Sequence, residues 1–309
     1  MSESPRSIVA LFGPTGVGKT AVAIELARLL RGRGEDPVAI SADALQVYRG
    51  LATLTGVASA AEQAELEHRL LSFLPVDASF SAGQYAELAH AEIDAALAQS
   101  RRPIVVGGTG LYLRAALTEL DLRPPPAEGV RERLTAELER YGPAALHARL
   151  TEEAPWAALQ IDPNDRQRVV RALELLQAGE LEPPEGANQL WTEEVRHPTL
   201  LAGLVMEREA LYSQIDARVD QMLRSGAIEE VRAASVAGAG DTARKALGFE
   251  DLLRGDVEAM KRRTRNYARR QLTWMRKLEP PLQIDLTKRS AAQAAAEIAR
   301  TLEQAERRS

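Results

Sequence analysis

One stretch near the start of the chain decides the fold: IVALF at residues 8–12, followed by GPTGVGKT at residues 13–20. The five apolar residues predict a buried strand, and helical periodicity runs from Thr20 to Leu30. The segment between them has the spacing of a phosphate-binding loop, G-x-x-x-x-G-K-[ST]. In such a loop, backbone N–H groups converge on phosphate oxygens, Lys19 neutralises charge and Thr20 can bind magnesium. The stretch therefore predicts a di- or triphosphate site and leaves the reaction open.

Strands and helices alternate after this loop. Strands are predicted at 37–40 and 103–106, and the second of these precedes a helix that starts at Leu111. Such alternation favours a mostly parallel sheet with crossover helices. The fold class expected is therefore α/β, with a parallel sheet of the P-loop NTPase type flanked by helices.

The middle of the chain predicts a separate, all-helical domain. Between Leu122 and Pro198 the strand pattern is absent, and helical runs at 130–140, 143–150 and 163–177 are separated by prolines, including those at 124–126 and 183–184. Strand character returns at 200–206 and at 282–286, and a terminal helix is predicted at 291–307. We therefore expect a core domain formed by residues 1–121 and 199–309 and a helical insertion at 122–198.

Composition excludes several classes of protein. The chain has 309 residues and no cysteine, so disulfides, cysteine zinc sites and thiolate nucleophiles are excluded. Its four histidines are too far apart in sequence for a local metal-binding pair. No apolar run reaches the ~18 residues of a membrane span, and the short polar segment 1–6 has no targeting pattern. These features predict a cytoplasmic protein that does not enter a membrane.

Two further segments follow predicted strands. Asp43 ends the 37–40 strand region, and Gly107-Gly108-Thr109-Gly110 follows the 103–106 strand. Ligands collect at the carboxyl ends of parallel strands, so Asp43 is a candidate base or magnesium ligand, and the glycines would permit close approach of a ligand. A turn or N-cap aspartate and a simple tight turn are the structural alternatives.

Basic residues are concentrated in one late segment, although the net charge is −5. Residues 261–277, KRRTRNYARRQLTWMRK, carry eight basic residues and no acidic one, and apolar residues recur at helical spacing from 256 to 279. The pattern predicts an amphipathic helix with a basic face suited to a nucleic acid backbone, with Arg262, Arg265, Arg269 and Arg276 mostly outside. Tyr267 and Trp274 are expected in the core. In the helix from Pro163, one face carries Gln167, Arg168 and Arg171, which is either a solvated surface or a binding surface.

Seven blocks in order resemble the tRNA dimethylallyltransferase family, in its bacterial form. They are GPTGVGKT, ISADALQVYRG, VVGGTGLYLRA, DPNDRQRVVRALEL, ARVDQMLRSGAIEEV, KALGFEDLL and RNYARRQLTWMRK. The chain differs from the family at Ala44, where serine is common, and after Gly50, where a GTAKP-like block is common. It also lacks the cysteine-containing zinc finger of some eukaryotic relatives.

The resemblance implies transfer of a dimethylallyl group from dimethylallyl diphosphate to N6 of adenosine 37, in tRNAs that read U-initial codons. Asp43 would take the proton from N6, and Thr15, Lys19 and Arg218 would complete the catalytic set. Magnesium would be the cofactor, bound through Thr20. The residues implied to bind the diphosphate are Gly13, Pro14, Thr15, Gly16, Val17, Gly18, Lys19 and Thr20.

The resemblance also implies a tRNA anticodon stem-loop as the partner of a monomeric enzyme. The target base would leave the anticodon stack to reach the core domain. The implied tRNA-contacting residues are Asp43, Ala44, Leu45, Gln46, Thr109, Arg131, Gln167, Arg168, Val169, Val170 and Arg171.

Two other functions share the same loop. A P-loop kinase would phosphorylate a nucleoside or small metabolite with ATP, and a nucleotide-dependent switch or RNA-binding protein would use no catalysis. A relative that prenylates free adenine nucleotides would lack much of the RNA-binding surface. The basic segment after Lys261 argues against that relative, and Asp43 would have no role in the switch.

Overall fold

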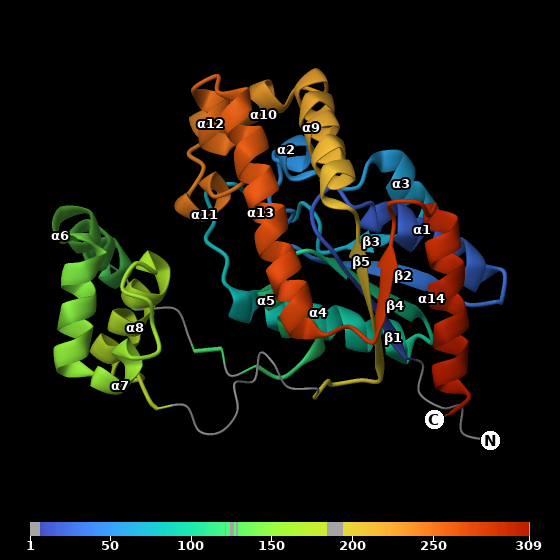
Figure 1. The fold of residues 1–309 in the computed structure, drawn as a ribbon, viewed down its shortest axis with the longest axis horizontal. Coiled ribbons are helices and arrows are strands. Elements are labelled where there is room, and N and C mark those ends of the chain that lie inside the picture. Colours follow the sequence, from blue (N-terminus) through green and yellow to red (C-terminus); the bar gives the residue numbers. More distant parts are fainter. Residues whose placement is uncertain (1–6, 121, 124–126, 128, 184–193, 309) are drawn as a thin grey trace. The chain divides into compact units, whose positions relative to one another are not determined.

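The computed structural model describes residues 7–120, 122–123, 127, 129–183 and 194–308 (Figure 1). The chain divides into a core unit, residues 1–120 with 193–309, and a helical unit, residues 121–192. The helical unit therefore begins one residue earlier, and ends six residues earlier, than the sequence predicts. The segment 1–6 and the prolines at 124–126 and 184 lie outside the described residues.

The core unit is built on one parallel sheet of six strands. Its order is β3-β2-β4-β1-β5-β6. The strands are β1 (Ile8–Phe12), β2 (Pro37–Ala42), β3 (His68–Arg69), β4 (Arg102–Gly107), β5 (Thr199–Val205) and β6 (Leu282–Asp285). All five residues of β1 are buried, because β1 pairs with β4 on one side and β5 on the other. The phosphate loop therefore leaves the centre of the sheet.

Helices cover both faces of this sheet. Figure 1 shows α1 (Lys19–Arg31) beside α14 (Ala291–Glu306), and α4 (Ala82–Ala98) beside α5 (Gly110–Leu117). Right-handed crossovers place α1 and α4 on opposite faces, because β1-α1-β2 and β3-α4-β4 run in opposite directions across the sheet. The main core is formed by β1, β5 and the apolar faces of α1 and α14.

A second group of helices packs beyond the sheet in the core unit. It consists of α2 (Ala52–Thr55), α9 (Arg208–Arg224), α10 (Ala227–Val236), α11 (Asp241–Arg244), α12 (Phe249–Leu253) and α13 (Val257–Leu278). The short helix α3 (Ala60–Glu65) has no buried residue and pairs with α1 through Glu65 and Arg28. Tyr48, Phe249 and Met260 are buried in its core. Helix α9 follows β5 directly, and α13 contacts both α9 and α5.

The helical unit contains α6 (Val130–Glu153), α7 (Pro155–Ala158) and α8 (Arg166–Ala178). The two runs predicted at 130–140 and 143–150 are the halves of α6, which kinks at Gly142 (φ 81°) before Pro143. The run predicted from Pro163 begins at Arg166, because the Asp165 side chain accepts a hydrogen bond from the Arg168 amide as an N-cap.

No helix among the described residues is long and apolar enough to cross a membrane.

Candidate active site

The phosphate loop has the closed backbone that its glycines predict. Gly16 (φ 83°) and Gly18 (φ 98°) adopt left-handed conformations that L side chains rarely adopt. The Lys19 ammonium donates hydrogen bonds to the carbonyls of Gly13 (2.9 Å) and Pro14 (3.0 Å), which closes the loop. Thr20 is the second residue of α1, so its hydroxyl lies at the helix N-terminus. This arrangement suits a phosphate group.

Two cations come together at this loop. Burial and the nearby Arg218 guanidinium lower the pKa of Lys19 to about 7, and Asp43 partly offsets this effect. Burial also lowers the pKa of Arg218. Such shifts are expected where positive groups lie close together with little solvent. The site is therefore electrostatically prepared for an anion.

Asp43 follows β2 directly and lies at the same edge of the sheet. It is close enough to Lys19 and Arg218 to favour the charged form of both. Its Oδ1 accepts a hydrogen bond from the Leu45 amide (2.9 Å), so Asp43 also forms the turn that was one of the alternatives. That single bond leaves its second oxygen without a hydrogen bond from the described residues, so a turn role does not exclude a role as base.

Arg218 extends from α9 to a glycine turn at Gly56. Its Nη2 donates to the Gly56 carbonyl (3.3 Å), and a Cβ at Gly56 would lie 1.8 Å from that nitrogen. Gln46 donates to the same carbonyl (3.2 Å) and accepts from the Ser41 hydroxyl (3.0 Å). Gln46, predicted to contact tRNA, therefore also supports the turn that holds Arg218.

Aromatic side chains surround Asp43. The rings of Tyr85 and Tyr112 are tilted by 40° with centroids 4.6 Å apart, and the Tyr85 hydroxyl donates to the Ser41 carbonyl (3.0 Å). Tyr267 of α13 shares a hydrogen bond with the Thr109 hydroxyl (3.0 Å). Burial, and next the charge of Asp43, raise the pKa of Tyr267 to about 12. The carboxylate thus lies near neutral tyrosines as well as the two cations, and the aromatic rings would suit a flat aromatic substrate.

Gln271 of α13 was not predicted from the sequence. It is 4% exposed, and it bonds both the phosphate loop and the glycine turn after β4. The available signal, which the sequence analysis did not use, is a polar residue on the buried face of an amphipathic helix. Its partners, Thr15 and Gly108, lie 256 and 163 positions away along the chain, so no local sequence pattern could predict them.

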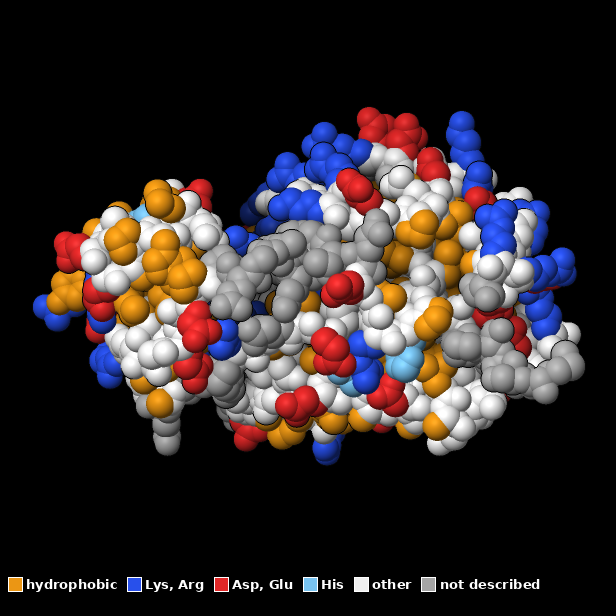
Figure 2. Space-filling view, turned by 90° about the horizontal axis from the view of Figure 1, so that it is seen from below, with side chains coloured by type: hydrophobic (Ala, Val, Ile, Leu, Met, Phe, Trp, Pro, Cys, Tyr) orange, Lys and Arg blue, Asp and Glu red, His pale blue; other side chains and the backbone are white. Residues whose placement is uncertain are grey.

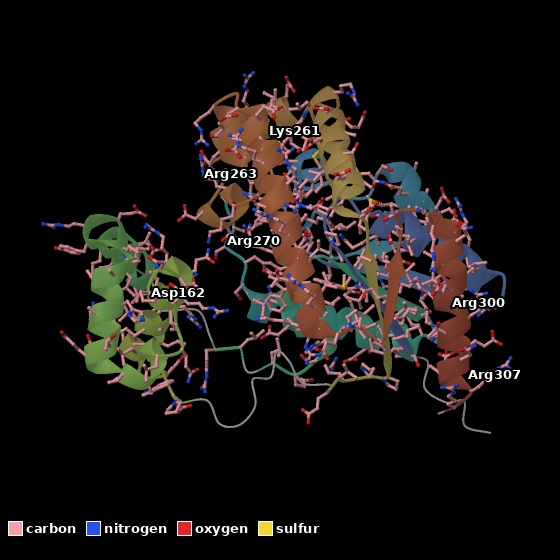
Figure 3. The ribbon with its side chains drawn as sticks, in the orientation of Figure 1. Asp162, Lys261, Arg263, Arg270, Arg300 and Arg307 are labelled. Atoms are coloured by element: carbon pink, nitrogen blue, oxygen red, sulfur yellow. The ribbon has the colours of Figure 1, made fainter. Side chains whose placement is uncertain are left out.

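The outer face of α13 carries most of its basic residues, but Arg265, which was expected on that face, forms an ion pair instead. Arg265 and Lys261 do not lie free outside, because they pair with Asp216 (2.6 Å) and Asp220 (2.7 Å) of α9. The exposed residues of this outer face are Arg262, Arg263, Asn266, Arg269, Arg270, Thr273, Arg276 and Lys277. Figure 3 shows Arg263 and Arg270 projecting from the same side of the helix, as seven-residue spacing requires. In Figure 2, Lys and Arg side chains gather at the top and along the right edge of the core unit, and acidic side chains also lie at the top.

The helical unit presents a second set of predicted residues. Gln167 and Arg168 are exposed on α8, whereas Val169 is fully buried and Val170 is 8% exposed. The side chains of Val169 and Val170 pack into the core of the helical unit, and their contact with tRNA stays a prediction.

Two arginines of this unit share one buried carboxylate. Glu174 accepts hydrogen bonds from Arg131 (2.6 and 2.8 Å) and from Arg171 (3.1 Å). These charge-assisted bonds lower the pKa of Glu174 against the opposing effect of its burial. The two guanidinium groups are thereby held side by side, with Arg131 the more exposed.

Fold and site together define a P-loop-type α/β protein with an anion site next to a carboxylate. The chain belongs to the IPP transferase family, whose model matches residues 46–278. It is 38% identical over 301 residues to the tRNA dimethylallyltransferase of Symbiobacterium thermophilum, covering 94% of this chain and 92% of the relative. It is 41% identical over 293 residues to that of Rhodospirillum centenum, covering 88% of each chain.

Two solved structures have folds similar to that of this chain. The tRNA isopentenylpyrophosphate transferase of Bacillus halodurans superposes with a TM-score of 0.68 at 32% identity, covering 97% of both chains. A eukaryotic dimethylallyltransferase, solved acting on tRNA, has a TM-score of 0.74 at 23% identity, covering 97% of this chain and 80% of that one, and shows the likeness of fold alone. The chain is an enzyme of this family and shares its fold.

Proposed function

We propose that this enzyme transfers the dimethylallyl group of dimethylallyl diphosphate to N6 of adenosine 37 in tRNAs that read U-initial codons. The observation that carries the proposal is the position of Asp43 beside Lys19 and Arg218 at the carboxyl end of the sheet. A base and a cationic site for a leaving group are the two elements that this reaction needs. The activity named for the relatives from Symbiobacterium thermophilum and Rhodospirillum centenum supports it.

In the proposed step, the N6 nitrogen forms a bond to C1 of the dimethylallyl group as the C1–O bond breaks. The electron pair of that bond leaves with the diphosphate, whose charge Lys19, Arg218 and the loop amides stabilise. The N6 proton goes to Asp43. An aromatic amine is a weak nucleophile because its lone pair is delocalised, so removing this proton as the bond forms lowers the barrier.

Magnesium fits the donors at this site. Hydroxyl and phosphate oxygens are ligands that it prefers, and it usually binds through few protein groups. No group of three acidic, histidine or cysteine side chains that could hold a metal occurs among the described residues. Thr20, at the start of α1, would supply a protein oxygen and the diphosphate would supply others. The ion would add positive charge to the leaving group's surroundings.

The RNA would be bound by basic side chains from both units. Arg262 and Arg269 on α13 and Arg131 of the helical unit are exposed cations. We propose that the anticodon stem-loop binds to them, with the enzyme acting as a monomer in the cytoplasm.

A kinase using ATP is not favoured, because the chain belongs to a family of prenyltransferases. The two functions are separated by measuring diphosphate release with unmodified tRNA and either dimethylallyl diphosphate or ATP. We expect release from dimethylallyl diphosphate that requires tRNA. ATP hydrolysis or phosphate transfer without such release would reverse this conclusion.

A further inference from the structure

We propose that Gln271 is a positioning residue for the transfer reaction, which fixes the phosphate loop in its diphosphate-binding form through a side-chain amide on α13. This inference rests on the proposed function and adds a residue to it. Gln271 does not contact the reacting atoms. It acts through the backbone of the loop that would hold the leaving group.

The amide of Gln271 bonds two loops at once. Its Oε1 accepts a hydrogen bond from the Thr15 amide (2.8 Å), and its Nε2 donates to the Gly108 carbonyl (2.8 Å). Both ends of the amide are therefore used. Because Gln271 is 4% exposed, water cannot readily replace either bond.

The close fit around this amide leaves little room for another arrangement. A Cβ at Gly108 would lie 2.3 Å from Gln271 Nε2 and 3.0 Å from the Gly13 carbonyl. One turn to either side, α13 makes two more contacts with the same region: Tyr267 bonds Thr109, and a Cβ at Gly110 would lie 2.1 Å from Trp274. Gln271 is thus central in a row of contacts along one face of α13.

Fixing Thr15 has a consequence for the phosphate site. The Thr15 amide is committed to Gln271, while the Lys19 ammonium bonds the carbonyls of Gly13 and Pro14, the two residues that precede Thr15. The loop is therefore held at its first turn from two directions. The amides further along the loop remain to bind phosphate in a preset arrangement, which lowers the entropic cost of binding.

Only a side chain with one donor and one acceptor satisfies both loops. Gln271→Met keeps the length and removes both bonds. Gln271→Glu keeps the shape, but its ionised carboxylate has no proton to donate to the Gly108 carbonyl. Protonation of that carboxylate would restore the donor, so the glutamate variant should improve as the pH falls.

The test compares these two variants with the parent enzyme and with Thr264→Val. Thr264 is a buried residue of the same helix, 8% exposed, whose hydroxyl donates only to the Met260 carbonyl (2.8 Å). Its substitution therefore controls for loss of a buried hydrogen bond in α13. Thermal unfolding of each variant establishes that it folds.

Two measurements are made on each protein. Calorimetry with inorganic diphosphate and magnesium gives the Kd of the loop site without any transfer reaction. Steady-state transfer gives kcat and separate KM values for dimethylallyl diphosphate and tRNA. For Gln271→Met we expect both the Kd for diphosphate and the KM for dimethylallyl diphosphate to rise about tenfold, as loss of a positioning bond of ordinary strength implies. The KM for tRNA should stay within about twofold, and Thr264→Val should match the parent.

The pH profile distinguishes positioning from a merely structural role. The parent enzyme and the Gln271→Glu variant share the other ionisable groups that face this site, which are Lys19, Asp43, Arg218 and Tyr267. The readout is therefore the ratio of the variant's activity to the parent's activity at each pH, in which the effects of these shared groups cancel. We expect this ratio to rise as the pH falls from about 8.5 to about 6. A flat ratio, or a Gln271→Met variant with the parent's Kd and KM, would overturn the proposal.

Failure of the proposed function would look different. If the parent transferred no dimethylallyl group, yet Gln271→Met still weakened diphosphate binding, the effect of Gln271 on the loop would stand and the assigned reaction would fall. If transfer occurred and both substitutions left it unchanged, the assigned reaction would stand and the role of Gln271 would fall.

Discussion

Lys19, Arg218 and Asp43 place two positive charges and one negative charge around a single partly buried site. The pKa of Lys19 is lowered to about 7 because its cation is desolvated and faces a second cation. The ligand-free enzyme therefore holds an electrostatically unfavourable arrangement, and an anion bound at the loop would relieve it. The site is organised for the charge of the leaving group before any substrate arrives.

This arrangement predicts proton uptake on diphosphate binding. Above pH 7 much of Lys19 is neutral in the free enzyme, and a bound anion raises its pKa and restores its proton. We expect diphosphate affinity to fall as the pH rises above about 7, with uptake approaching about one proton per site near pH 8. Calorimetry in buffers of different ionisation enthalpy measures that number. In Lys19→Met, only the diphosphate itself can exchange protons on binding, so proton uptake should be smaller than in the parent. Equal proton uptake in the parent and in this variant would refute the assignment of the uptake to Lys19.

Asp43 carries the second prediction at this scale. Asp43→Asn keeps the size of the side chain and an oxygen that can accept the hydrogen bond from Leu45, but removes the base. We expect single-turnover transfer to slow by about 10²-fold or more, with tRNA affinity within about twofold of the parent. Near-normal transfer by this variant would remove Asp43 from the mechanism.

At the scale of the element, α13 separates its basic residues into two roles. Arg262 and Arg269 lie on the outer face, whereas Arg265 pairs with Asp216 of α9. We expect Arg262→Ala and Arg269→Ala each to weaken tRNA binding by about 1 kcal/mol and to reduce the slope of log affinity against log salt by about one. Filter binding over a series of salt concentrations measures both.

Arg265→Ala serves as the matched comparison for α13. It removes the same charge from the same helix but acts at the contact with α9, the helix that carries Arg218. It should change diphosphate binding and thermal stability more than the salt slope. Equal salt slopes in all three variants would mean that the outer face does not bind RNA.

The elements were largely predictable, and their spatial relations were not. Hydrophobic runs indicated five strands within two residues of their observed ends, because buried parallel strands are nearly continuous apolar segments. Strand β3, His68–Arg69, has only two residues and no such run. The P-loop spacing identified the phosphate site, whereas Gln271 and the Tyr267–Thr109 pair depend on contacts between distant segments. Val169 and Val170 are buried in the helical unit beside the exposed Gln167 and Arg168, since a sequence block shared with a family does not separate its buried residues from its exposed ones.

At the scale of the whole molecule, the net charge of −5 conceals an uneven distribution. The exposed face of α13 is basic, and Glu174 holds Arg131 and Arg171 together in the helical unit. Local charge, and not the sum, governs attraction of an RNA backbone at physiological ionic strength.

The proposal that basic residues of both units bind tRNA predicts additive effects. Arg131 bonds Glu174 and Arg269 bonds Asn266, so the two arginines share no partner in these interactions. The free-energy costs of Arg131→Ala and Arg269→Ala for tRNA binding should therefore add to within about 0.5 kcal/mol in the double variant. An Arg131→Ala variant with the parent's affinity would limit RNA binding to the core unit.

The most direct test of the central claim is mass spectrometry of nucleosides from an unmodified tRNA that reads U-initial codons, after incubation with the enzyme, magnesium and dimethylallyl diphosphate. We predict that one adenosine, at position 37, gains a dimethylallyl group, that the gain requires the diphosphate substrate, and that Asp43→Asn nearly abolishes it. Unmodified adenosine together with phosphate transfer from ATP to a small acceptor would contradict the account.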